Sequence, residues 1–127
     1  MESSQNITTN EEGSKTTIKL SNIKRNLSSE LIHKILEKIF SKKKTYNAIY
    51  TLKKEYHKKN IGICYINFIN TIYIKELANN LKEFGIKNKE DKINIEYAKM
   101  QGNEFIKIIQ EKRGQQPNLD FIVFSDY

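Results

Sequence analysis

The 127-residue sequence has little of what metal sites and covalent cross-links require. It contains one cysteine, Cys64, which excludes an intramolecular disulfide and any cysteine-cluster metal site. Its two histidines, His33 and His57, fall on a predicted helix and in a loop, without the spacing of metal ligands. We therefore expect neither a metal nor a cofactor.

Long apolar runs are also missing. No stretch approaches the roughly 20 apolar residues that a membrane-spanning helix needs, and no apolar secretion signal follows Met1. These absences predict an intracellular protein that does not bind a membrane. Of the two main compartments, we favour the nucleus over the cytoplasm.

Residues arranged for catalysis are not evident either. Aspartates and glutamates are scattered, without a pair placed for acid–base chemistry, and no nucleophile stands beside a base. A small phosphatase of related fold would need a glycine loop to cradle phosphate, and the sequence does not contain that pattern. We therefore expect no enzymatic activity.

The clearest positive feature is charge. Lysine and arginine total 22 against 15 aspartates and glutamates, which gives a net charge of +7. This balance favours an anionic partner, although charge alone does not distinguish RNA from DNA or an acidic membrane. Lysine is common along the whole chain, so part of the charge reflects composition. The length suits one domain with one core.

Apolar periodicity divides the chain into strands and helices. Alternating or β-branched stretches predict strands at 16–23, 45–52, 60–68 and 92–98. Helical spacing predicts a helix over 29–40, a second that Thr71 caps and Gly85 ends, and a short third that Gly114 ends. The order is that of an α+β, ferredoxin-like fold: a four-stranded antiparallel sheet with two helices on one face. The opposite face is expected to be open.

Both ends of the chain differ from this pattern. Residues 1–14 are polar and lack aromatic residues, which predicts a disordered tail. Residues 113–127 form an apolar extension in which Phe121 to Phe124 are consecutive apolar residues. Such a run is rarely left in water, so we expect it to pack on the domain over 15–112, as an edge strand or over the third helix. The alternative is a flexible tail whose apolar residues bind a partner protein.

Two of the predicted strands resemble the signatures of the RNA recognition motif. "IKLSNI" (18–23) fits its hexamer, and "IGICYINF" (61–68) fits its octamer. A closer resemblance is to the C-terminal RNA recognition motif of the Mei-two-like meiosis regulators, in "TTIKLSNI", "NIGICYINF" and "EYAKMQG" (96–102). It covers about residues 16–112. The resemblance implies a ferredoxin-like domain that binds RNA on its sheet.

Alternation indicates which side chains would meet that RNA. Cys64, Ile66 and Phe68 should face the helices, whereas the residues between them should face the open side of the sheet. With the resemblance, this predicts RNA contacts from Lys19, Asn22, Lys58, Lys59, Ile63, Tyr65, Asn67, Lys99 and Gln101.

Tyr65 is the one stacking ring expected on the platform, because the motif's other two outward aromatic positions hold Lys19 and Ile63. Each contact has a simpler alternative: Tyr65 as an ordinary exposed tyrosine, Asn22 as a turn residue, and the lysines as solvated groups. Tyr50 is ambiguous, because alternation does not decide which way its strand faces.

These observations predict a monomeric, single-domain protein that binds single-stranded RNA on its sheet face, with a lysine-rich rim. The alternative is a protein-interaction module of the same fold in a ribonucleoprotein complex. Its protein partner would bind the third helix or the C-terminal segment.

Overall fold

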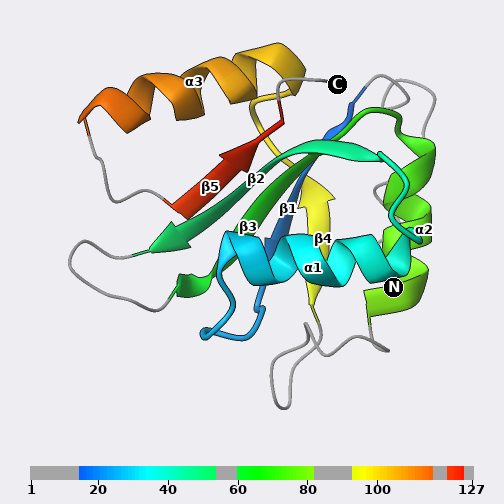
Figure 1. Cartoon of the computed structure of the whole chain (residues 1–127). Coiled ribbons are helices and arrows are strands. Elements are labelled where there is room, and N and C mark those ends of the chain that lie inside the picture. The colour runs from blue at the N-terminus through cyan, green and yellow to red at the C-terminus, as the bar shows by residue number, and fades with distance from the viewer. Residues whose placement is uncertain (1–14, 54–59, 82–92, 116–119, 125–127) are drawn as a thin grey trace.

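The computed structural model describes residues 15–53, 60–81, 93–115 and 120–124 (Figure 1). Within these ranges the chain forms β1 Thr17–Ser21, α1 Ser29–Ile39, β2 Tyr46–Lys53, β3 Asn60–Phe68, α2 Ile72–Asn80, β4 Asn94–Tyr97, α3 Gly102–Gln115 and β5 Asp120–Val123. The expected tail over 1–14 and the predicted helix end at Gly85 lie outside the described residues.

The α+β class and the antiparallel sheet are confirmed. The strands of the described ranges form one sheet in the order β4-β1-β3-β2-β5, and every neighbouring pair is antiparallel. This sheet has five strands instead of the expected four, because β5 adds to the free edge of β2.

The main core lies between the sheet and the helices α1 and α2. Its strand residues include Ile18, Leu20, Ile49, Cys64, Ile66 and Phe68, and its helix residues include Ile32, Leu36, Ile74 and Leu77. Alternation thus predicted the inward face of β3 correctly, and Phe68 is 1% exposed. The amphipathic α1 begins where Ser28, its N-cap, accepts a hydrogen bond from the Leu31 N–H at 3.1 Å.

The start of α2 differs from the expected one. The Thr71 side chain makes no capping hydrogen bond, and its backbone is already helical. Asn70 supplies the acceptor instead, since its Oδ1 lies 3.0 Å from the Ile72 nitrogen. The short polar side chain one position earlier therefore satisfies the first free N–H.

The opposite face of the sheet is covered, not open, where β2 passes. There α3 packs Phe105 and Ile109 against Ala48 and Tyr50, which are almost fully buried. Figure 1 shows α3 beside β5, away from α1 and α2. The helix is also longer than expected, because it continues through Gly114 to Gln115. Phe105 and Ile109 are one turn apart and present one apolar stripe, which explains why the helix docks on this face.

The C-terminal strand β5 is held by the sheet and by α1 together. The Ser29 N–H donates to both carboxylate oxygens of Asp120, at 3.2 and 3.1 Å, and the Ser29 hydroxyl donates to the Asp120 carbonyl at 2.8 Å. At the other end of β5, the Phe124 N–H donates to the Asn47 carbonyl at 2.9 Å. An acidic side chain at the N-terminus of α1 also complements the helix dipole.

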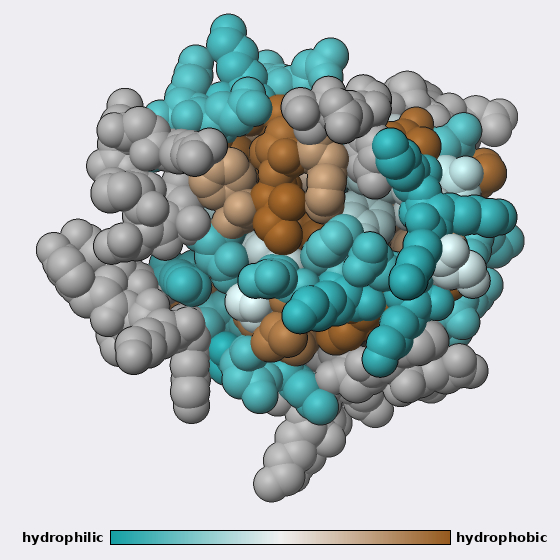
Figure 2. All heavy atoms as spheres, in the orientation of Figure 1, coloured by the Kyte–Doolittle hydropathy of each residue, from teal (hydrophilic) through white to brown (hydrophobic). Residues whose placement is uncertain are grey.

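The two faces of β5 contact different layers. Ile122 pairs with Ile49 and so shares the side of α1, whereas Phe121 and Val123 pack into the cluster under α3. Figure 2 shows the molecule from the side of α1, with apolar side chains gathered over β5 between α1 and α3. Strand β5 thus lies between the layer of α1 and the layer of α3. Its residues are half-buried, so part of its apolar surface stays in contact with water.

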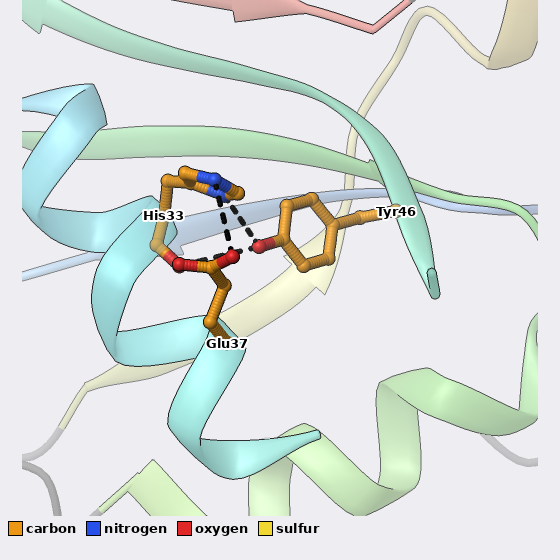
Figure 3. Close-up of polar contacts among 3 residues, drawn as sticks. All are labelled: His33, Glu37 and Tyr46. Carbon is orange, nitrogen blue, oxygen red and sulfur yellow. Dashed lines mark hydrogen bonds and ion pairs between the residues drawn. The ribbon is translucent and has the colours of Figure 1, made fainter. Parts of the chain in front are cut away.

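A cluster of rings connects the residue after β5 to α1 and β2. Figure 3 shows two of its members, His33 of α1 and Tyr46 of β2, together with Glu37. The Tyr46 hydroxyl lies 2.6 Å from Nδ1 of His33, and it donates to the His33 carbonyl at 3.2 Å. His33 Nε2 lies 3.7 Å from a Glu37 carboxylate oxygen. The Phe124 ring packs on both His33 and Tyr46, with centroids 5.0 and 5.9 Å away. Tyr46 is 2% exposed, so this cluster serves packing.

The Asp120 contact with α1 leads to a test of stability. Asp120→Ala removes both carboxylate acceptors, and we expect it to lower the free energy of unfolding by about 1–2 kcal/mol. Asp120→Asn keeps one acceptor oxygen without the charge, so its loss should be about half as large. Urea unfolding measures both. Glu111→Ala, at an exposed position of α3, is the matched control, and an equal loss in this control would contradict the contact.

The core position of Cys64 leads to a test with pH. Burial raises the pKa of the Cys64 thiol to about 12. The folded protein therefore keeps a proton that the unfolded chain loses above about pH 8.5, and stability should decrease as pH rises from about 9 to 12. Cys64→Ala should remove this part of the decrease. Alkylation of the native thiol at pH 8 should be more than about a hundredfold slower than in urea. Equal alkylation rates would show that the thiol is accessible.

Candidate nucleic-acid interface

A cleft of about 490 Å³ lies between the outer face of the sheet and α3. Its described lining residues are Lys19, Tyr50, Leu52, Tyr65, Glu96, Tyr97, Ala98, Lys99, Met100, Phe105, Ile108, Ile109 and Lys112. The sheet supplies the floor, α3 one wall, and the segment between β4 and α3 the rim. This volume is typical of a site that encloses one small ligand, for which about 300–1,000 Å³ is usual.

Aromatic rings from three elements meet in this cleft. Tyr50 and Tyr65 are direct partners in the β2–β3 register, and their rings stack with centroids 6.2 Å apart and planes at 22°. Phe105 of α3 lies 5.9 Å from Tyr65, tilted by 46°. Burial, and next the neighbouring Tyr65, raise the pKa of the Tyr50 hydroxyl. Tyr50 is therefore the covered member of the pair, whereas Tyr65 is half-buried at the cleft.

Charged side chains surround the rings. Lys19 and Glu96 face each other on β1 and β4, with Nζ 3.7 Å from Oε1. Lys99 and Lys112 are exposed at the rim and on α3. The described lining thus holds three lysines against one glutamate. An ion pair that is partly exposed contributes little to stability, so an anionic ligand can compete with Glu96 for Lys19.

Asn67 does not lie on an open platform as expected. It is 4% exposed, and its Oδ1 accepts hydrogen bonds from the hydroxyls of Thr16 and Thr17 at 2.8 and 2.6 Å. Its Nδ2 donates to Oδ1 of Asn47 at 2.7 Å. The Asn67 side chain does face away from α1 and α2. On that side, however, it is surrounded by the start of β1 and by the part of β2 where the register shifts between Tyr46 and Ala48. Its polar groups are engaged within the fold.

Gln101, also expected to contact RNA, connects the start of α3 to β1. Its Oε1 accepts hydrogen bonds from the N–H groups of Thr16 and Thr17, at 2.9 and 2.7 Å. Its Nε2 donates to the carbonyls of Thr17 and Ala98, at 2.8 and 2.7 Å. These contacts position the wall of the cleft without entering it.

Apart from Asn22, the remaining predicted site residues separate into three groups. Lys19, Tyr65 and Lys99 come together in the cleft. Ile63 is half-buried on β3 opposite Ser21 and does not line it. Lys58 and Lys59 lie outside the residues that the structure describes.

Asn22 has a backbone that explains its residue type. Its φ is 68°, in the left-handed region that asparagine tolerates better than most residues. Of the two readings of Asn22, this conformation supports the turn.

Sequence reasoning missed the contribution of α3. Phe105, Ile109 and Lys112 follow each other at spacings of four and three, so they share one side of the helix. That spacing was visible in the sequence. The sequence did not show which surface the helix would cover, because alternation left the facing of Tyr50 undecided.

Comparison of the chain with models of known protein families finds no match, and comparison with curated proteins finds none either. Within the described ranges, no helix is long and apolar enough to cross a membrane. In the same ranges, no group of three or more histidine, cysteine, aspartate or glutamate side chains is placed to hold a metal ion. The geometry of the cleft therefore has to carry the functional argument.

The Gln101 contacts lead to a test of whether this residue is structural. Gln101→Leu leaves the N–H groups of Thr16 and Thr17 without their acceptor, and we expect it to lower the free energy of unfolding by about 2–4 kcal/mol. Thermal and urea unfolding measure the loss. Lys99→Ala, two residues earlier and exposed, should cost less than about 0.5 kcal/mol. If Gln101→Leu is as stable as the parent, the contacts are not important for the fold.

Proposed function

We propose that the protein binds single-stranded RNA in the cleft between the sheet and α3, as a domain of the RNA recognition motif type. The observation that carries this proposal is the meeting of stacked tyrosines with three lysines in one cleft. A nucleobase needs a flat apolar surface on which to stack, and its phosphates need cations nearby. The cleft offers both within the size of a small-ligand site.

The arrangement of the first four strands supports the motif type. Their order is β4-β1-β3-β2, with helices α1 and α2 on one face, as in a ferredoxin-like domain. The two stretches that resemble the motif's signatures lie on the neighbouring strands β1 and β3. The likeness to the Mei-two-like meiosis regulators rests on short sequence stretches, and no meiotic role is proposed from it.

The cleft suggests how the nucleotide is held. The accessible part of Tyr65 meets a base, while Tyr50 and Phe105 support the ring from behind. Lys19, released from Glu96, and the exposed Lys99 and Lys112 meet phosphates. Rings from β2 and α3 thus support Tyr65, but they are buried and do not replace the two platform aromatics that β1 and β3 lack.

A second candidate is a protein-interaction module of the same fold. It is favoured by the apolar surface over β5, where Ile122 and Phe124 are half-buried on the side of α1 (Figure 2). This surface lies on the opposite side of the sheet from the cleft. Substitutions at the two places therefore separate the candidates: an RNA-binding protein depends on the cleft, and an interaction module depends on β5.

Stacking on Tyr65 gives the first test of RNA binding. Tyr65→Ala should weaken the binding of single-stranded RNA by about 1–3 kcal/mol, because one base loses its stacking partner. Tyr65→Phe keeps the ring and should bind within about 0.5 kcal/mol of the parent. Fluorescence anisotropy with a labelled random-sequence RNA measures affinity, and circular dichroism checks folding. Unchanged affinity in the folded alanine variant would refute the stacking role.

The lysines give a second test through salt. Each phosphate contact with a single strand adds about 0.7 to the slope of log K against log salt. Replacing both Lys99 and Lys112 by alanine should therefore flatten that slope by about 1.4. The matched control replaces Lys34 and Lys38, two exposed lysines of α1 on the other side of the sheet. Equal flattening in the control would mean that binding follows overall charge and not the cleft.

A further inference from the structure

Helix α3 is fastened to the sheet at both of its ends. At its start, the Gly102 N–H donates to the Thr17 hydroxyl at 2.8 Å, beside the Gln101 contacts with β1. After its end, the chain enters β5, which pairs with β2 and places Phe121 and Val123 in the cluster beneath α3. Both attachments oppose separation of the helix from the sheet.

This fastening blocks one direction across the sheet. Ala48 and Tyr50 of β2 lie under α3, with exposures of 0% and 8%, and Tyr65 of β3 touches Phe105. On the other side, β1 and β4 carry the partly exposed Lys19 and the exposed Glu96. A strand that enters from β4 and crosses β1 therefore meets α3 when it reaches Tyr65, because the helix covers Ala48 and Tyr50 of β2 beyond it.

Building on the proposed function, we infer that the cleft receives the terminal nucleotide of a single-stranded RNA and not an internal stretch. The terminal base lies against Tyr65 beneath α3, and the adjoining phosphates run past Lys19 and Lys99 to solvent. The cleft volume of about 490 Å³ suits one nucleotide. Met100, 39% exposed at the rim, adds an adaptable apolar side chain that can fit different bases.

The decisive comparison is between RNA with ends and RNA without ends. A random-sequence pool of about 20 nucleotides, longer than one site of about 4–16 nucleotides, is measured as linear molecules and again after covalent circularisation. We expect the full-length protein to bind the linear pool at least about tenfold more tightly, because the circle cannot place a base beneath α3. Equal binding of both pools would overturn the end-specific site and leave RNA binding intact. Binding of neither pool would overturn the proposed function as well.

Two further binding measurements, one with end-sealed RNA pools and one with free nucleotides, define what the cleft recognises. Linear pools with either the 5′ or the 3′ end sealed in a stable hairpin show which end is needed, and one of them should lose affinity as the circle does. If neither sealed pool loses affinity, the inference is wrong. A mixture of nucleoside monophosphates tests a free nucleotide as occupant. Competition as strong as that of the linear pool would also overturn the assignment to a strand end.

Opening the cleft provides the complementary test. Ile109→Asp and Val123→Asp each put a charge into the cluster that holds α3 on the sheet, one from the helix and one from β5. We expect either variant to bind the circular pool at least about fivefold better than the parent, because a strand can then cross β2. Hydrogen exchange of the α3 amides verifies that the helix is loosened while β1 and β3 stay protected. If α3 is loosened and the circle is still excluded, α3 is not what stops the strand.

Discussion

Strand β2 carries apolar side chains on both of its faces, and neither face can be left in water. Tyr46 and Ile49 point into the core beneath α1 and α2, whereas Ala48 and Tyr50 point the other way. The second pair requires a cover, and α3 and β5 supply it. The covered outer face, the cleft beside it and the position of the C-terminal strand all follow from this requirement.

The same requirement explains the roles of several polar residues. A helix laid across a sheet brings its first turn close to strand ends whose N–H and C=O groups need partners. Gln101 supplies them at the start of β1, and Asp120 supplies an acceptor at the start of α1. Asn67 instead accepts hydrogen bonds from the Thr16 and Thr17 hydroxyls. These side chains are used to join elements, so they are not available to a ligand.

The cleft is lined by side chains other than these three polar residues. Tyr65 is supported by buried rings, and Lys19 is held by a weak ion pair with Glu96, so both are positioned before any ligand arrives. Positioned groups lose less side-chain entropy on binding than free ones. The cover that α3 places over part of the outer face, with the cleft beside it, distinguishes this surface from an open sheet platform.

Much of the fold was readable in the residues alone. Alternation placed Ile18, Leu20 and Phe68 in the core, and helical spacing located α1 and the beginning of α3, because these patterns depend only on local geometry. The outer face of β2 was not readable. A register shift between Tyr46 and Ala48 breaks the alternation there, so Tyr46 and Ile49 share one face. Which side chains line the cleft and which became structural depended on where α3 docked. That docking joins segments of β2 and α3 that are about 60 residues apart in the chain, and only the folded arrangement brings them into contact.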